Sequence, residues 1–196
     1  MKHAMITIFI FLVLGQSVFA QKAKPATYDV DPLHSSLVFT VGYKLSDFSG
    51  SFGEMTGSAV LADEDDFGTA QIAFEVPLAS VYTNSETRDG HLQGERYFNA
   101  GAAPKATFKS NHVKSLGNNQ YEVTGDLSMA GKTLAQTILV TILDKGEVAD
   151  QSGKKQMLMG VSAEFTFNRS NFGITGGLPL IGDEVKIKSS LSMAKK

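Results

Sequence analysis

The chain has 196 residues, no cysteine, no tryptophan and a formal net charge of −2 at pH 7. The lack of cysteine excludes a disulfide framework and thiolate chemistry. The weak and interspersed charge excludes a basic surface for nucleic acid or an anionic membrane, and the length suits one domain with its own core.

The N-terminus predicts a cleaved signal peptide, from Met1 to Ala20. Lys2 precedes an apolar run over residues 5–14, and small residues stand at the last and third-last positions before the expected cut after Ala20. The run is shorter than the ~20 residues of a membrane span, and a retained anchor is the alternative. No cysteine follows it that could be lipidated. We therefore expect residues 21–196 to form a single domain outside the cytoplasm.

Alternation of apolar and polar residues predicts antiparallel strands with one buried face. The expected strands cover residues 37–44, 72–76, 107–115, 121–129, 133–143, 161–168 and 184–193. Turn sequences at 63–68, 116–119 and 130–132 connect them as hairpins. Because the pattern contains no βαβ unit, it predicts an all-β sandwich or barrel.

One segment departs from the strand pattern. Asn84 or Ser85 can cap a helix that continues to about Tyr97. Gly90 lies inside this segment and costs a helix ~1 kcal/mol relative to alanine, so we expect the helix to be short or irregular.

Five polar residues are candidates for a ligand-binding or buried polar network: His34, Arg88, Asp89, His91 and Arg169. Arginine donates a rigid fork of hydrogen bonds, and histidine can donate or accept, so the group could hold a polar head group. The alternative is an internal ion pair that braces the fold. A metal site from His34, His91 and Asp89 has suitable ligand types but no diagnostic spacing. Catalysis by an Asp-His pair lacks an evident nucleophile.

Phenylalanines recur on most of the expected strands. Phe39, Phe74, Phe108, Phe165 and Phe167 would point into a common interior. Plain core packing is the usual role of such residues. A barrel of about eight strands either fills with side chains or holds one small ligand, and both possibilities stay open at this point.

Several motifs, in order along the chain, resemble those of the YceI-like family. They are 28–35 at the start, Arg88 to Leu92 with Tyr97-Phe98, 104–108 with Ser110, 125–129 with Gly131, and Asn168-Arg169 with Phe172-Gly173. Three positions depart from the usual family pattern, namely Gly90, Ala130 and Asn171. Asn171 replaces an acidic residue, so a charge partner for a basic group is expected to be missing.

The resemblance implies an extended eight-stranded antiparallel lipocalin-like β-barrel with one short helix, in the bacterial periplasm. It also implies a polyisoprenoid, an isoprenoid quinone or another long amphiphile bound non-covalently inside the barrel, and a possible homodimer. On this view no cofactor, metal or catalytic residue is expected. The polar candidates above would lie at the mouth or in a buried network. The expected apolar ligand-binding residues are Phe39, Val41, Phe74, Val76, Phe108, Leu127, Phe165, Phe167, Phe172, Ile187 and Leu191.

The sequence thus favours a periplasmic protein that carries or sequesters a long isoprenoid or fatty amphiphile. Two alternatives remain. One is an enzyme, or an enzyme accessory, that acts on such a lipid through the Arg-Asp-His group. The other is a filled barrel that serves as a stress or interaction protein.

Overall fold

A computed structural model describes residues 23–196, so the predicted signal peptide lies outside the described residues. The strands are β1 (Ala26–Tyr43), β2 (Ser46–Phe52), β3 (Thr56–Asp63), β4 (Asp66–Pro77), β5 (Val81–Tyr82), β6 (Lys105–Gly117), β7 (Gln120–Met129), β8 (Lys132–Ala149), β9 (Lys155–Asn168) and β10 (Ile181–Lys195). The helices are α1 (Glu86–Gln93) and the short 3-10 turns η1 (Leu78–Ser80) and η2 (Arg169–Phe172). No helix in this part of the chain is long and apolar enough to cross a membrane.

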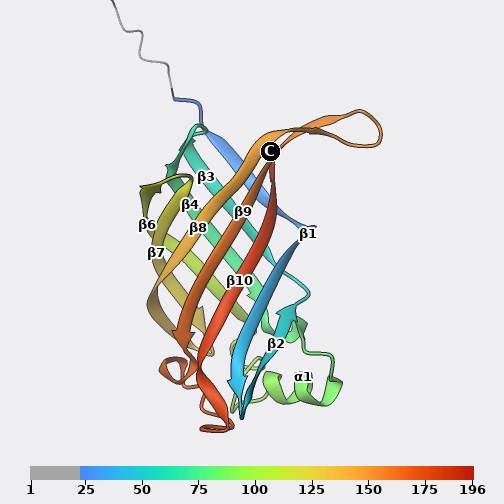
Figure 1. Cartoon of the computed structure of the whole chain (residues 1–196), viewed down its shortest axis with the longest axis vertical. Helices are drawn as coiled ribbons and strands as arrows, with labels where there is room; N and C mark the ends of the chain where they lie inside the picture. Colours follow the sequence, from blue (N-terminus) through green and yellow to red (C-terminus); the bar gives the residue numbers. More distant parts are fainter. Residues whose placement is uncertain (1–22) are drawn as a thin grey trace, which may run out of the picture.

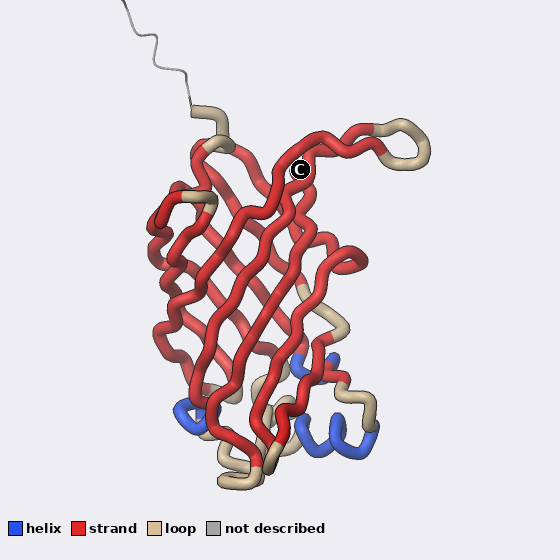
Figure 2. Tube along the Cα trace, in the orientation of Figure 1, coloured by secondary structure: helices blue, strands red, loops and turns tan. Residues whose placement is uncertain are grey.

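The sheet closes on itself into a barrel (Figures 1 and 2). Eight strands follow one another around it in the order β1, β3, β4, β6, β7, β8, β9 and β10, and β10 pairs with β1 to complete the circle. All neighbouring pairs are antiparallel. The structure therefore confirms the predicted eight-stranded antiparallel barrel, to which β2 and β5 are short additions.

Strand β1 changes partner halfway along its length. Its first part pairs with β3 over Ala26–Asp29, and its second part pairs with β2 over Leu37–Tyr43. An irregularity between Asp31 and Ser36 separates the two parts. As a result β2, β5 and α1 lie beside the second half of β1, at one end of the barrel (Figure 1).

Several elements differ from the sequence prediction. Strands β1, β4 and β9 begin at Ala26, Asp66 and Lys155 instead of at residues 37, 72 and 161, and β2, β3 and β5 were not predicted. The helix α1 ends at Gln93 instead of near Tyr97, because Gly94 adopts an extended conformation and its N–H bonds the carbonyl of His91. Ser85 occupies the N-cap position but makes no side-chain capping bond. Strand β8 runs to Ala149, and with β9 it forms a hairpin that projects beyond the barrel (Figure 2).

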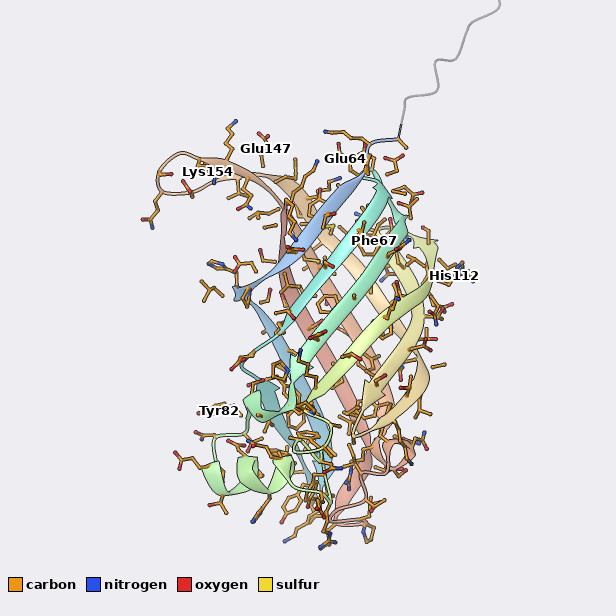
Figure 3. All side chains as sticks on the ribbon, turned by 180° about the vertical axis from the view of Figure 1, so that it is seen from behind. Glu64, Phe67, Tyr82, His112, Glu147 and Lys154 are labelled. Carbon is orange, nitrogen blue, oxygen red and sulfur yellow. The ribbon has the colours of Figure 1, made fainter. Side chains whose placement is uncertain are left out.

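The barrel end away from α1 is filled. Tyr28, Leu61, Val123 and Met193 are almost fully buried there. Over this packed core Glu64 forms ion pairs with Lys24, at 3.0 Å, and with Lys195. The two lysines lower the pKa of Glu64 to about 2. Figure 3 shows Glu64 at this end of the molecule, above Phe67.

Candidate functional site

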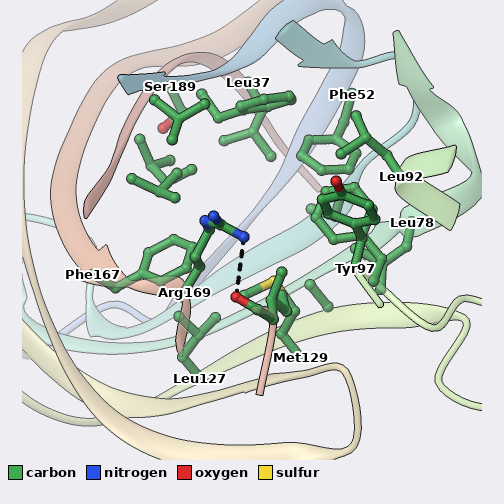
Figure 4. A pocket seen from close by; sticks show the side chains of 18 of the residues that line it. Leu37, Phe52, Leu78, Leu92, Tyr97, Leu127, Met129, Phe167, Arg169 and Ser189 are labelled. Atoms are coloured by element: carbon green, nitrogen blue, oxygen red, sulfur yellow. Dashed lines mark hydrogen bonds between the residues drawn. The ribbon is translucent and has the colours of Figure 1, made fainter. Parts of the chain in front are cut away.

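The α1 half of the barrel is hollow. It encloses a cavity of about 580 Å³ lined by residues from most strands, from α1 and from the loops on either side of it (Figure 4). Ligand pockets commonly have volumes of ~300–1,000 Å³. Nearly all of the lining side chains are apolar, so the cavity suits a hydrophobic molecule of considerable size.

Glycines in the wall explain why aromatic side chains leave this space open. Phe39 pairs in register with Gly50, and Phe74 with Gly57. A Cβ atom would lie 2.4 Å from the Phe39 ring at Gly50 and 2.6 Å from the Phe74 ring at Gly57. The rings therefore lie over the glycines, an arrangement that protects a strand glycine and packs an aromatic ring against the sheet.

Most of the predicted apolar residues border the cavity. These are Phe39, Val41, Phe74, Val76, Phe108, Leu127, Phe165, Phe167, Ile187 and Leu191. Phe172 does not, although it was predicted to. It is buried behind the wall, where its ring packs edge-on against Phe167 with centroids 5.4 Å apart. Phe172 thus supports a lining residue from outside the cavity.

The sequence analysis missed an aromatic group on the α1 side of the cavity. Phe48 and Phe52 of β2 and Phe98 after α1 all line it. Phe52 lies 5.8 Å from both Phe39 and Phe98, measured between ring centroids. The alternation of Phe48, Gly50 and Phe52 is a strand pattern, but its glycine and serine neighbours conceal it.

Arg88 and Asp89 both bind Thr83, a buried residue just after β5. The Arg88 Nε donates to Thr83 Oγ1 at 2.8 Å, and Thr83 Oγ1 donates to an Asp89 carboxylate oxygen at 2.5 Å. The Arg88 guanidinium also stacks 4.4 Å from the centre of the Phe48 ring. The bracing of α1 thus runs through the Thr83 hydroxyl and not through the expected ion pair, since none of the ion pairs in residues 23–196 contains Arg88 or Asp89. Arg88 borders the cavity as well, whereas Asp89 does not.

The two candidate histidines lie apart. His91 is exposed at the cavity mouth. His34 lies outside the cavity, in the irregular part of β1, with its Nδ1 2.6 Å from Asp31. That hydrogen bond lowers the pKa of the Asp31 carboxyl. In residues 23–196 no group of three histidine or carboxylate side chains is gathered that could hold a metal ion, and Asp89 and His91 do not converge as an acid–base pair.

Arg169 is a buried cation at the edge of the cavity (Figure 4). Its guanidinium donates to the carbonyl oxygens of Gly182, Ile174, Gly176 and Ile181, over distances of 2.7–3.1 Å. These bonds hold the loop before β10 in place. Burial lowers the pKa of Arg169, and the charge of Asp183 partly opposes that change.

The four hydrogen bonds satisfy Arg169 donors without neutralising its charge. No carboxylate of the described residues forms an ion pair with it. A guanidinium has five N–H donors, and the recorded bonds use four. Asn171 stands where family members more often carry an acid, and its backbone carbonyl accepts a bond from Lys132. An electronegative ligand group would therefore find a buried positive charge here that Asp183 compensates only in part.

Comparisons with known proteins agree with this architecture. The sequence pattern of the YceI-like domain matches residues 28–193. A UPF0312 protein from Pseudomonas paraeruginosa is 31% identical over 186 residues, covering 92% of this chain and 93% of its own. A UPF0312 protein from Shewanella oneidensis is 30% identical and covers 83% and 84% of the two chains.

Solved structures show the same fold. BcnA from Burkholderia cenocepacia superimposes with a TM-score of 0.74 at 23% identity, covering 83% of this chain and 98% of its own. A polyisoprenoid-binding domain from Saccharophagus degradans, implicated in plant cell wall breakdown, has a TM-score of 0.59 at 14% identity and covers 86% and 98%. With the family pattern matched along nearly the whole described barrel, this chain belongs to the YceI-like family.

Proposed function

We propose that this protein binds a long amphiphile, such as a polyisoprenoid or an isoprenoid quinone, in the hollow half of its barrel. The observation behind the proposal is the apolar cavity of about 580 Å³ that is closed at one end. The polyisoprenoid-binding domain from Saccharophagus degradans, which shares the fold, adds general support for lipid binding. The protein would act as a carrier or a store and perform no covalent chemistry.

The cavity offers a prenyl chain its main source of affinity. Burial of apolar surface contributes ~25 cal/mol per Å², or ~0.8 kcal/mol for each methylene group. The lining on β10 runs from Ile181 to Leu191. Ten residues span ~33 Å along a strand, which is roughly 25 Å along the axis of a barrel with tilted strands. Because half of a bilayer core measures ~15 Å, this length favours a chain longer than a common acyl chain.

The polar end of the ligand would lie near Arg169 or at the mouth beside Arg88 and His91. A buried guanidinium that lacks a carboxylate partner is stabilised by an electron-rich neighbour. A phosphate, a carboxylate or a quinone carbonyl fits that description. Orientation by a few polar groups in an otherwise apolar pocket is usual for ligand sites.

The setting of this activity follows from the predicted signal peptide and is part of the proposal. We place the mature protein in the periplasm, where an amphiphile needs a protein to cross the aqueous space. A homodimer is also expected from the family resemblance. Light scattering at micromolar concentration tests it, and a monomeric mass would contradict it.

The direct test is native mass spectrometry of protein purified from its own periplasm, with organic extraction and identification of the lipid. We expect a co-purifying prenyl lipid or quinone. Ala163→Trp should reduce its amount strongly, because Ala163 lines the cavity and the indole would occupy the ligand's space. Ala135→Trp is the matched control, since Ala135 is exposed on β8.

Two results would contradict the proposal. One is a protein that is empty when isolated and takes up no added prenyl lipid. The other is an equal loss of lipid from both tryptophan variants, which would show that the lipid is not held in the cavity. Circular dichroism of each variant establishes that the barrel has folded.

A further inference from the structure

Exposed leucines gather at the mouth end of the barrel. Leu45 is 104% exposed, Leu180 61% and Leu178 39%. We call these three residues the leucine tip. Leu45 lies in the turn between β1 and β2, and the other two lie in the loop before β10. The backbone N–H of Lys44 donates to the Leu180 carbonyl at 3.1 Å, so the two loops are joined, and Figure 1 shows both at the α1 end.

The fold itself does not account for Leu45. A two-residue hairpin turn joins Tyr43 to Ser46, and Lys44 has a φ of 54°. Turns of this kind favour Asn, Asp or Gly where φ is positive, which here is the position of Lys44, and nothing in the turn requires a leucine at the next position. Leu45 is fully exposed, so it packs against nothing in residues 23–196 and leaves its apolar surface in water. Its side chain is therefore available to an external apolar partner.

The leucine tip lies close along the chain to residues of the cavity wall. Tyr43 and Ile181 pair across β1 and β10, and both of them line the cavity. Ile181 follows Leu180 directly, and Tyr43 is two positions before Leu45. The apolar residues of the outermost loops thus lie close along the chain to residues that line the hollow half of the barrel.

From this proximity we infer that the leucine tip docks on the surface of a lipid bilayer, so that ligand passes between membrane and cavity without crossing water. The inference rests on the proposed function. Tyr43 and Lys44 flank the tip, with the Lys44 ammonium 5.1 Å from the Tyr43 ring. Tyrosine and lysine are residues that favour the interface between hydrocarbon and water.

The size of the tip fits a membrane better than a protein. Three leucine side chains expose on the order of a few hundred Å², whereas stable protein interfaces bury ~800 Å² on each partner. A few inserted apolar side chains do suffice for reversible attachment to a bilayer. Docking would therefore be transient, as delivery of a ligand requires.

The test is co-sedimentation of purified, ligand-free protein with phosphatidylcholine vesicles at physiological ionic strength. The double variant Leu45→Asn, Leu180→Asn should bind about a hundredfold more weakly. Each leucine that becomes partly buried in the bilayer contributes about tenfold. The control is Leu33→Asn, since Leu33 is 89% exposed in the irregular part of β1, away from the tip. Its binding should equal that of the wild type.

A second measurement separates this inference from the proposed function. The double variant should hold as much prenyl lipid in detergent solution as the wild type, but transfer it between vesicles more slowly. If the wild type does not sediment with vesicles, or if the double variant sediments equally well, the inference is overturned. Light scattering gives a further outcome. If the wild type is a dimer, the double variant is a monomer and neither sediments with vesicles, the leucine tip is a dimer contact and the inference is overturned. The sedimentation uses ligand-free protein, so its result does not depend on bound lipid. A protein that never holds lipid would therefore refute the proposed function and leave the sedimentation result unchanged.

Discussion

At the scale of single residues, the cavity depends on two glycines in its wall. Gly57 and Gly50 have no side chain, and the rings of Phe74 and Phe39 occupy the space over them. The same rings on a wall with Cβ atoms would have to turn toward the lumen. A glycine that weakens a strand by its flexibility is here the reason that an aromatic-rich interior is hollow.

Gly57→Ala is expected to reduce both stability and ligand capacity. The new methyl would lie 2.6 Å from the Phe74 ring, and overpacking of this kind costs about 1–3 kcal/mol. Urea unfolding measures the free energy of unfolding, and mass spectrometry measures the bound lipid. Gly42→Ala is the control because no atom lies within 4 Å of its added methyl. Equal effects of both substitutions would contradict the wall-packing argument.

At the scale of elements, α1 is attached to the barrel by few contacts. None of its residues is buried, so hydrophobic packing contributes little to its position. The hydrogen bonds of Arg88 and Asp89 to Thr83 hold it beside the cavity mouth. An element of this kind opens locally at low cost in free energy, which makes α1 the segment most able to widen the mouth.

Thr83→Val is expected to release α1 without unfolding the barrel. The substitution removes two hydrogen bonds to charged groups, each worth ~1.5–3 kcal/mol. Hydrogen exchange of the α1 amides should accelerate at least tenfold, while amides of β7 stay protected. Thr40→Val removes a surface bond to Ser49 of 2.9 Å and is the control. Unchanged exchange in α1 would show that other contacts fix the helix.

The sequence analysis was most successful where a strand has one face toward the barrel interior and the other toward water. The alternation over residues 161–168 and 184–193 predicts β9 and β10, because their inner face meets the core and their outer face meets water. It failed for β3, for β2, whose glycine and serines hide the period of two, and for the outer half of β8, which leaves the barrel. Placement of site residues depends on barrel closure and on the irregularity in β1. For that reason Phe172 and His34 could not be excluded from the cavity by local pattern.

At the scale of the whole molecule, the barrel divides into a filled half and a hollow half. The filled half contains most of the largest fully buried side chains, among them Tyr28 and Met193. Its outer end is held by the ion pairs of Glu64 with Lys24 and Lys195. Stability and ligand binding therefore reside mainly in different parts of one sheet.

Acid should weaken the filled half through Glu64. The pKa of Glu64 is about 2 in the folded protein, against an ordinary value of 4.5. Because the folded pKa is the lower one, its ion pairs stabilise the fold fully above about pH 4.5, and this contribution is lost as the pH falls toward about 2. Glu64→Gln should lower the melting temperature at pH 7, and the difference from wild type should shrink across that window.

Glu164→Gln provides the control for this titration. Glu164 forms its ion pair with Lys188 on the outer wall of the barrel, where both side chains are exposed. Surface pairs contribute ~0–1 kcal/mol, so its melting temperature should stay close to that of wild type at every pH. A constant difference between wild type and Glu64→Gln from pH 7 down to pH 3 would contradict the assignment to Glu64.

The filled half also closes one end of the cavity and so limits its depth. Leu191 lines the cavity, whereas Met193, two residues further along β10, does not line it and is 2% exposed. A chain that enters tail first must stop at that level. The protein would then select ligands by chain length. Homologous prenyl chains should gain affinity with each added unit until the tail reaches the closed end of the cavity. Beyond that length each further unit would remain outside, in water, and the affinity would level off.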